Sequence, residues 1–557
     1  MKGFLKKTLI FIAVMAVVAS AGWFGRKAYH KAAGHQLVAE AQKYLGQKDV
    51  RNASLCLQRA LQLNPLNLDA NRLVADMLEE AGDPSAVAWR IRVYQIQTNN
   101  VENCFAWAQT ALKMKDTPSA VQALRDVPEN KRSSVQFHKL AGVLAWNVHD
   151  VTSAEKEFTE ALQLDPSNLT IVLNLASVRL SSTNSSVADQ ARLTLEQIPA
   201  SSPLHLTALR YLAIDAVSHK SLDRALVYSQ QTVKDPQATY ADKLAHLQIL
   251  HEADSPGFDA WQAALADDAA KSPAHAYALG DWIQRVESPA AALLWLQSLP
   301  FATQTNLPVP LAITDCQISL KEWPGMLGIV TKQDWGELNY YRLALESLGR
   351  QESGETRESE MAWQKALTLC SHRLDRLTRL NQIISAWKWT SERCVVLEKI
   401  VEQFPKETWA DEQLIALYYA QGKTRELAYL LDEMLTADPT NIRLKNNLAS
   451  LLLLRKSDLE KARRMALEAY DSDTNNPFYA CTYAYSLLLQ SKPAEAAKIF
   501  SSMKTDYLKN PSIAAYYGIV EAEVGNKMVA KAPLQLAGNA KLLPEEMELV
   551  RQASARL

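Results

Sequence analysis

Two short segments carry residue types that could bind a metal ion or a phosphate group, but the spacing fails in both. His251-Glu252 begins the zinc motif H-E-x-x-H, in which two histidines one helical turn apart share an ion, yet Ser255 stands where the second histidine is needed. The run from Gly422 to Thr424 matches the end of the phosphate-binding loop G-x-x-x-x-G-K-[ST], yet Leu417 replaces its first glycine. We instead expect Gly422 to end a helix.

The cysteines are also spaced too widely for the common metal and redox motifs. They are Cys56, Cys104, Cys316, Cys370, Cys394 and Cys481. No C-x-x-C pair occurs among them, which excludes zinc-ribbon, rubredoxin-like and thioredoxin-like spacings. In an exported protein these thiols could form disulfides, although the sequence does not specify which would pair. We therefore predict no catalytic, cofactor-binding or metal-ligating residues, and a protein that is not an enzyme.

Tryptophans gather in the middle of the chain, where they could anchor a peptide or stack on sugar rings. Nine of the 13 tryptophans lie between residues 261 and 409. We predict Trp295 and Trp363 in the core, because both fall near large-residue packing positions. Trp387 and Trp389 are predicted partner-binding residues, since two residues two positions apart on a helix cannot share one buried face.

Charge and glycine content narrow the class of protein. The chain of 557 residues has 60 Lys and Arg against 61 Asp and Glu, which gives a formal charge of −1. It therefore lacks the excess of positive charge that is typical of nucleic-acid-binding proteins. We therefore predict no nucleic-acid partner. Its 18 glycines are few for this length and disfavour all-β folds and nucleotide-binding α/β folds. Helices joined by short turns are the expected architecture.

A pattern of small and apolar residues recurs with a period of about 34 residues, which is the sequence signature of a helical repeat. It reads small-x3-apolar-x2-small, as in Ala154, Phe158 and Ala161, and five consecutive units near the C-terminus keep the register. Their leading residues are Arg393, Leu427, Ala462, Ala496 and Ala530. Offsets of 3, 4 and 7 place these residues on one face of a helix.

A second small residue stands twelve positions before many of the leading ones, as Gly142 does before Ala154 and Gly518 before Ala530. This spacing predicts two antiparallel helices that approach closely where neither carries a bulky side chain. Pairs such as Asp165-Pro166 and Asn476-Pro477 mark the ends of helices, because a residue before proline is pushed out of the helical conformation. The chain is predicted to alternate helix, turn, helix and proline turn.

These residues resemble the tetratricopeptide repeat (TPR) family, and the best single match runs from Leu140 to Pro166. The consensus tryptophan of the first helix is mostly missing, and the strong matches cover roughly two-thirds of the chain. The resemblance implies an all-α, right-handed TPR superhelix whose first helices line a concave groove for a peptide or protein partner. Asn446 and Asn447 lie on a first helix near groove-facing positions, so they are also predicted partner-binding residues. The neighbouring repeats lack the Lys and Asn set with which some members of the family clamp a C-terminal carboxylate.

The N-terminal residues predict a membrane anchor. Lys2, Lys6 and Lys7 precede an uncharged, mostly apolar run over residues 8–24, whose length of about 25 Å as a helix is at the short end for crossing a bilayer. A cleaved signal peptide is the alternative, because Ala19 to Ala21 fits a small-x-small cleavage site. The basic tail favours a single-pass protein of the inner (cell) membrane with its repeats on the periplasmic side.

The expected organisation is an anchor and juxtamembrane segment over 1–34, a first TPR block over 35–299, an irregular proline-containing break over 300–337 and a second TPR block over 338–557. The expected function is a membrane-anchored scaffold for protein–protein interaction in a bacterial envelope assembly, such as secretion or polysaccharide export. Two alternatives stay open. One is a cytoplasm-facing TPR regulator of envelope biogenesis, and the other is a glycan-binding protein or enzyme that uses the Trp-rich middle block. The partner, the pathway and the oligomeric state are not specified by the sequence.

Overall fold

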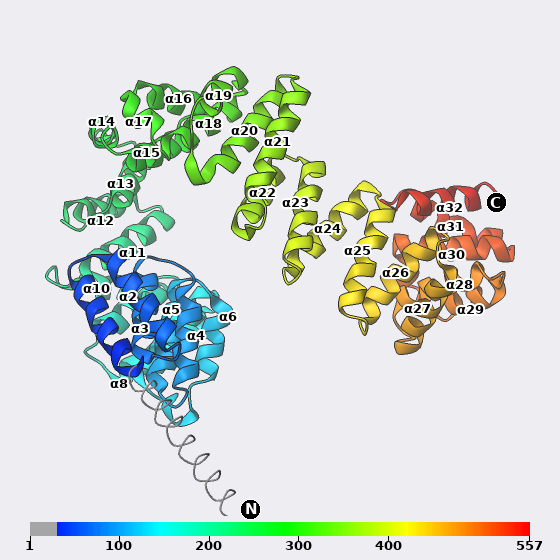
Figure 1. The fold of residues 1–557 in the computed structure, drawn as a ribbon, viewed down its shortest axis with the longest axis horizontal. Helices are drawn as coiled ribbons and strands as arrows, with labels where there is room; N and C mark the ends of the chain where they lie inside the picture. Colours follow the sequence, from blue (N-terminus) through cyan, green and yellow to red (C-terminus); the bar gives the residue numbers. More distant parts are fainter. Residues whose placement is uncertain (1–29) are drawn as a thin grey trace, which may run out of the picture. The chain divides into compact units, whose positions relative to one another are not determined.

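The computed structural model describes residues 30–557, and the secondary structure within this range is helical throughout (Figure 1). The chain divides into two compact units, Met1–Trp282 and Ile283–Leu557, each of which is described by itself. The division falls within α15 (Pro273–Val286).

The first unit is built from helices that pair with their neighbours along the chain. A helix over residues 30–46 precedes α2 (Val50–Leu63), α3 (Leu68–Glu80), α4 (Ala86–Ile96), α5 (Val101–Lys113), α6 (Thr117–Arg125), η1 (Glu129–Lys131), α7 (Val135–Asn147), α8 (Val151–Leu164), α9 (Leu169–Arg179), α10 (Ser185–Glu196), α11 (His205–Ser218), α12 (Leu222–Lys234), α13 (Tyr240–Glu252) and α14 (Phe258–Ala269).

The second unit continues the same arrangement. It contains α16 (Pro289–Ser298), α17 (Phe301–Thr305), α18 (Val309–Leu320), α19 (Trp323–Val330), η2 (Gly336–Leu338), α20 (Asn339–Glu352), α21 (Thr356–Cys370), α22 (Leu374–Ala386), α23 (Thr390–Gln403), α24 (Thr408–Gln421), α25 (Thr424–Ala437), α26 (Ile442–Leu454), α27 (Leu459–Ser472), α28 (Pro477–Leu488), α29 (Pro493–Ser501), η3 (Tyr507–Lys509), α30 (Pro511–Val524), α31 (Lys527–Gly538) and α32 (Pro544–Ser554).

Helix pairs such as α7 with α8, α26 with α27 and α30 with α31 pack against each other. The predicted all-α, TPR-like fold is therefore confirmed for the described residues. The close approach that the small residues predict is also present. A Cβ added to Gly142 of α7 would lie 2.7 Å from the Phe158 ring of α8, and one added to Gly518 of α30 would lie 2.7 Å from Cγ of Leu534 in α31. At both positions the partner helix occupies the space that any larger residue would need.

Many turns between the two helices of a pair contain one residue in the left-handed conformation, usually not glycine. These residues include Lys48, Lys115, His149, Lys220, Lys321, Lys388, Lys456 and Ser491. The left-handed conformation costs an ordinary residue about 1–2 kcal/mol. The scarcity of glycine therefore does not mean that left-handed turns are missing, because most of those turns use other residues. Gly422 is one of the exceptions and ends α24 at φ 65°, as predicted.

The turns that lead from one pair to the next rely on capping side chains. Asn67, Asn168 and Asn441 each accept a hydrogen bond from a backbone N–H in the first turn of the following helix. At Asn476-Pro477 and Asn510-Pro511 the asparagine is the N-cap and the proline occupies the first turn. These two pairs therefore begin a helix, because proline lacks only an N–H that the first turn does not use.

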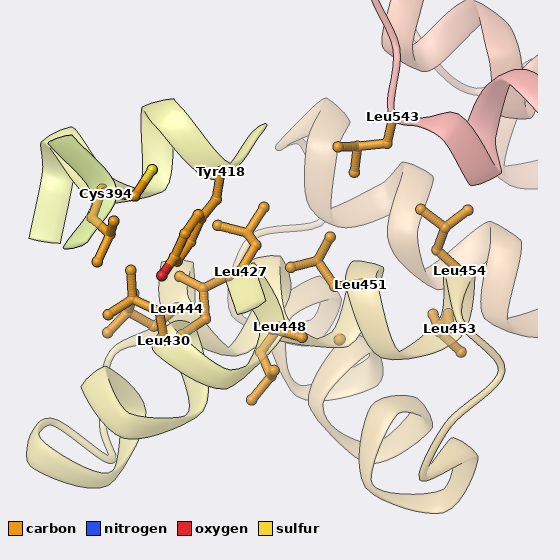
Figure 2. Packing of buried hydrophobic residues seen from close by; sticks show 14 of the residues in the cluster. Cys394, Tyr418, Leu427, Leu430, Leu444, Leu448, Leu451, Leu453, Leu454 and Leu543 are labelled. Atoms are coloured by element: carbon orange, nitrogen blue, oxygen red, sulfur yellow. The ribbon is translucent and has the colours of Figure 1, made fainter. Parts of the chain in front are cut away.

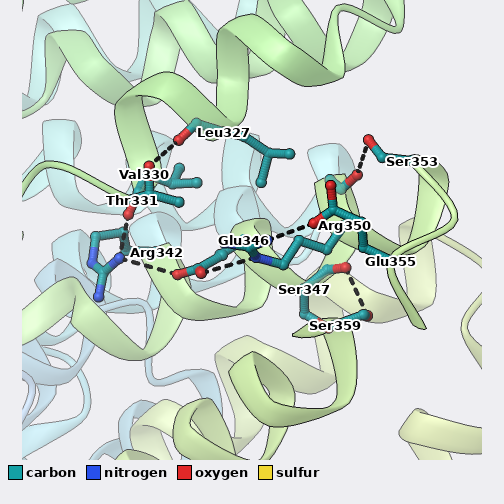
Figure 3. A network of polar contacts seen from close by, with 11 residues as sticks. Leu327, Val330, Thr331, Arg342, Glu346, Ser347, Arg350, Ser353, Glu355 and Ser359 are labelled. Atoms are coloured by element: carbon teal, nitrogen blue, oxygen red, sulfur yellow. Dashed lines mark hydrogen bonds and ion pairs between the residues drawn. The ribbon is translucent and has the colours of Figure 1, made fainter. Parts of the chain in front are cut away.

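Residues 300–337 contain three helices, and their prolines stand at helix starts. Pro300 and Pro308 are the N-caps of α17 and α18, and Pro324 lies in the first turn of α19. Charged side chains then connect α19 to α20 and continue along it (Figure 3): Arg342 donates to the carbonyl of Val330, and Glu346 and Arg350 pair at 3.1 Å. The domain boundaries given above stay predictions.

A continuous hydrophobic core runs through the second unit from Tyr340 to Ala553. Figure 2 shows part of it, where Leu427 and Leu430 of α25 lie near Leu444 and Leu448 of α26, and Leu543 precedes α32. Within residues 30–557, no helix is both long enough and apolar enough to cross a membrane. The predicted anchor over residues 8–24 and the cleavage site at 19–21 lie outside the described residues.

Candidate partner-binding cavity

Alternate helices of the second unit line one cavity of about 290 Å³. The lining side chains come from α24, α26, α28 and α30, which are the first helices of four consecutive pairs, and from the start of α32. A few lining residues also come from α25. The cavity therefore faces the side of the array on which the TPR resemblance places a partner.

The cavity is bounded by α32 because the start of this helix returns to the turn between α24 and α25. The Thr424 hydroxyl donates to an Oε of Glu545 at 2.7 Å, although the two residues are 121 positions apart. A Cβ added to Gly422 would lie 2.6 Å from the Pro544 ring. Gly422 thus meets two requirements, a left-handed φ and close contact with the start of α32.

Aromatic rings supply much of the cavity wall. Tyr419 comes from α24, Phe478 and Tyr485 from α28, and Tyr516 from α30. The rings of Tyr485 and Tyr516 are tilted with respect to each other, with centroids 4.8 Å apart. Phe478 is 51% exposed and so lies near the opening to solvent.

Two buried polar atoms of the wall have no hydrogen-bond partner in the described part of the chain. Asn446 is 4% exposed, and its Nδ2 donates to Oδ1 of Asn447 at 3.3 Å while its own Oδ1 is unpaired. Tyr485 is 3% exposed, and its hydroxyl is also unpaired. A buried polar group without a partner costs about 1–3 kcal/mol. Both atoms belong to residues that line the cavity.

Glu546, which is 8% exposed, is the only charged residue of the cavity wall. Its Oε1 accepts a hydrogen bond from the Tyr516 hydroxyl at 2.9 Å, and its Oε2 accepts one from the Leu543 N–H at 3.0 Å. Burial is the main cause that raises the pKa of Glu546, and it outweighs both hydrogen bonds, which lower the pKa. No lysine or arginine lines the cavity to compensate the carboxylate charge.

The structure brings together two of the four predicted partner-binding residues. Asn446 and Asn447 both line this cavity, the first buried and the second exposed. Trp387 and Trp389 lie in the turn between α22 and α23, on either side of the left-handed Lys388. They therefore do not share a helix, although the prediction of partner binding assumes that they do.

Both of these tryptophans are half-buried, and their ring centroids are 5.4 Å apart. Trp389 lines a separate, mostly polar cavity of about 460 Å³ beside Trp363, which is buried as predicted. Their role in partner binding stays a prediction.

Sequence reasoning missed Tyr419, Tyr485, Tyr516 and Glu546. The three tyrosines do not occupy one equivalent position of the repeat, so the 34-residue period does not mark them. Glu546 joins the cavity only because α32 returns to the α24–α25 turn, and no local pattern encodes this contact.

A larger cavity of about 860 Å³ lies among α23, α24 and α25. Five carboxylates line it, from Glu398, Glu402, Asp411, Glu426 and Glu433, together with Arg425. Acidic side chains alone do not define a ligand. Glu402 is exposed there, which makes it a suitable control position for substitutions at Glu546.

The other candidate chemistry is accounted for by structural roles. His246 is buried, shares a hydrogen bond of 2.8 Å with Ser229 Oγ and contacts the Trp261 ring, and burial lowers its pKa. All six cysteines lie among the described residues and none of them forms a disulfide there, so the pairings that the sequence left open are not made in this structure. Among residues 30–557 we find no group of three or more His, Cys, Asp or Glu side chains that could hold a metal ion.

Comparison with known proteins gives no family model and no curated protein that matches the chain. Three solved structures that resemble it are a Pseudomonas aeruginosa pilF structure, a tetratricopeptide repeat protein from Parabacteroides merdae and the Cut9–Hcn1 hetero-tetramer of the APC/C. Their sequence identities to this chain are 17%, 12% and 13%, and their TM-scores are 0.31, 0.37 and 0.28. The matches cover 40%, 51% and 85% of this chain, and 99%, 99% and 98% of the other chains. Because these TM-scores are low, the fold assignment rests on the helix pairs described above.

Proposed function

We propose that this protein is a membrane-anchored scaffold that holds an extended segment of a partner protein in the cavity lined by α24, α26, α28 and α30. The observation that carries the proposal is the pair of buried, unpaired polar atoms, Asn446 Oδ1 and the Tyr485 hydroxyl, in a cavity that opens beside an exposed phenylalanine. A bound segment would satisfy both atoms and cover the phenylalanine ring.

The second part of the proposal concerns location and setting. Residues 8–24 would cross the inner membrane with the N-terminus in the cytoplasm, and the helical array would face the periplasm as part of an envelope assembly such as secretion or polysaccharide export. The support is the apolar run flanked by lysines, together with an array that has binding surface but no recognised catalytic motif. A cytoplasm-facing regulator of envelope biogenesis is the alternative topology.

The glycan-binding or enzymatic alternative has less support. It needs exposed tryptophans on an open groove between residues 260 and 410. All nine tryptophans of that region are buried or half-buried between packed helices. We therefore favour protein binding.

Partner binding is tested by crosslinking from inside the cavity in living cells. A photoreactive phenylalanine analogue replaces Phe478, and the matched control carries it at Met528 of α31, which is 89% exposed and outside the cavity. We expect a discrete crosslinked protein from position 478 and none from position 528. Equal products at both positions, or none at 478, would contradict the proposal.

Topology is tested separately by adding protease to intact spheroplasts. We expect the repeats to be degraded from outside while a cytoplasmic marker protein survives. Repeats that persist until the spheroplasts are lysed would favour the cytoplasm-facing alternative.

A further inference from the structure

The cavity combines aromatic rings with a single carboxylate, and this combination suits a cation. The faces of Tyr and Phe rings attract a positive charge placed over them, and a carboxylate neutralises it. Here four rings and Glu546 line the same 290 Å³ cavity, and no basic residue among residues 30–557 lines it. The charged form of Glu546 is thus left without an ion-pair partner in the described structure.

The acceptors come from several elements, and all three belong to residues that line the cavity. Asn446 Oδ1 comes from α26, the Tyr485 hydroxyl from α28 and the Glu546 carboxylate from α32. An amide oxygen and a carboxylate can only accept hydrogen bonds, and a tyrosine oxygen can accept one. A ligand that forms hydrogen bonds with all three acceptors must therefore present several hydrogen-bond donors.

A lysine ammonium meets this requirement better than an arginine guanidinium. An ammonium is a compact charge with three donors that do not share a plane, whereas a guanidinium needs coplanar acceptors such as both oxygens of one carboxylate. Each Glu546 oxygen already accepts one hydrogen bond from the protein. The aromatic walls can also cover the apolar stem of a lysine, which carries four methylene groups.

We propose that the cavity is a lysine-binding subsite, in which the partner segment inserts one lysine side chain between the tyrosine rings and places its ammonium against Glu546, Asn446 Oδ1 and the Tyr485 hydroxyl. This inference rests on the proposed function, since it names the side chain by which the partner is recognised. Glu546 supplies the charge, and Asn446 and Tyr485 supply directional acceptors.

Burial of Glu546 gives the subsite a pH dependence. The titratable groups around it are Tyr419 of α24, Cys481 and Tyr485 of α28, Tyr516 of α30 and the neighbouring Glu545 of α32. Burial raises the pKa values of the three tyrosines and of Cys481, so these groups stay neutral around pH 5 to 8. Glu546 with its raised pKa is the group that ionises as the pH rises, and the ammonium should bind more tightly at pH 8 than at pH 5.

The test uses the full chain in detergent and n-butylammonium as a model of a lysine side chain, followed by saturation-transfer difference NMR. We expect a methylene signal at pH 8 that falls at least fivefold in Glu546→Gln and is unchanged in Glu402→Gln. n-Butanol, which has no charge, should give at least a fivefold weaker signal, and n-propylguanidinium should also be weaker than n-butylammonium.

Tyr485→Phe is the second variant, because it removes only a hydroxyl that has no partner and leaves the ring in place. We expect a several-fold weaker butylammonium signal and an unchanged circular dichroism spectrum. Equal signals from wild type, Glu546→Gln and Tyr485→Phe would overturn the lysine subsite.

The two proposals fail separately. If position 478 crosslinks a partner but butylammonium does not bind at Glu546, the scaffold proposal stands and the lysine subsite is wrong. If both hold, the partner peptide attached at position 478 should contain a lysine near the attachment point, and Glu546→Gln should reduce that crosslink. A lysine-free peptide would overturn the subsite.

Discussion

At the scale of single residues, Glu546 shows how a buried carboxyl group can lower the stability of the free protein. Burial raises the pKa of Glu546 above its ordinary value of 4.5, so the native state binds a proton more tightly than the unfolded state does. The stabilising effect of that proton is fully present below the unfolded pKa and is lost as the pH rises through the raised native pKa. Once the pH has risen above the raised native pKa, the free protein therefore carries a carboxylate that opposes folding.

Glu546→Gln should remove this penalty. Glutamine keeps an oxygen for the Leu543 N–H and has an amide N–H for the Tyr516 oxygen, while it never ionises. We expect the second unit to melt at a temperature a few degrees above wild type at pH 8, and equal to or slightly below it at pH 4. Thermal denaturation followed by circular dichroism at both pH values measures the difference.

Glu402→Gln is the control for overall charge, because Glu402 is exposed and does not line the cavity that contains Glu546. Its melting temperature should follow that of wild type across the pH range. If Glu546→Gln gave the same small change at pH 4 and pH 8, the buried carboxyl would not be the cause.

At the scale of helices, the geometry of each pair depends on where the small residues stand. Gly518 faces Leu534 across the α30–α31 pair, and its missing side chain sets how close the two helices come. Gly328 of α19 has open space around the position of a Cβ. The same substitution should therefore have opposite effects at these two positions.

Gly518→Ala should lower the free energy of unfolding of the second unit by about 1–3 kcal/mol, the usual cost of overpacking. Gly328→Ala should raise it by about 0.5–1 kcal/mol, because alanine favours the helix and nothing obstructs its methyl group. Urea denaturation of both variants measures the two changes. A gain in stability for Gly518→Ala would mean that Leu534 moves aside without cost.

Most helix pairs could be predicted because the constraint is local. Ala154, Phe158 and Ala161 are all buried, and so are Ala530, Leu534 and Ala537, since a period of 34 residues returns the same face to the neighbouring helix. The start of α32 could not be predicted, because its contact with Thr424 depends on how three intervening pairs stack. The repeat pattern was enough to select Asn446 and Asn447. The tyrosines were missed because they do not share one position of the repeat, and Glu546 was missed because its place depends on the contact of α32 with the α24–α25 turn.

The tryptophans show a second reason why the site could not be predicted fully from the sequence. Trp387 and Trp389 were selected on the assumption of a continuous helix, but the left-handed Lys388 separates α22 from α23 at that point. The turn lets both rings pack against the core of the second unit. A local pattern of apolar residues does not distinguish a helix from a tight turn that lacks glycine.

At the scale of the whole molecule, each helix mainly contacts its neighbours along the chain within its own compact unit. The loss of one helix should therefore destabilise mainly the helices that pack against it. A chain that ends at Leu542 lacks α32, which packs against α30 and α31. We expect faster amide hydrogen exchange in α28, α30 and α31, and unchanged exchange in α5 to α12.

Hydrogen exchange followed by mass spectrometry measures this effect peptide by peptide. Loss of protection in the first unit would show that stability is shared along the whole chain. An unchanged exchange rate in α30 would show that α32 contributes little to the fold of the last pairs.

The contact between Thr424 and Glu545 also sets an order of events during protein synthesis. Helices α25 to α31 can each pack on a neighbour as soon as they leave the ribosome, whereas the cavity needs residues 543–546 as well as the α24–α25 turn. A nascent chain that has folded through α31 therefore still lacks part of this cavity wall. A partner whose binding depends on Glu546, as proposed above, would not bind a chain before residues 543–546 are made.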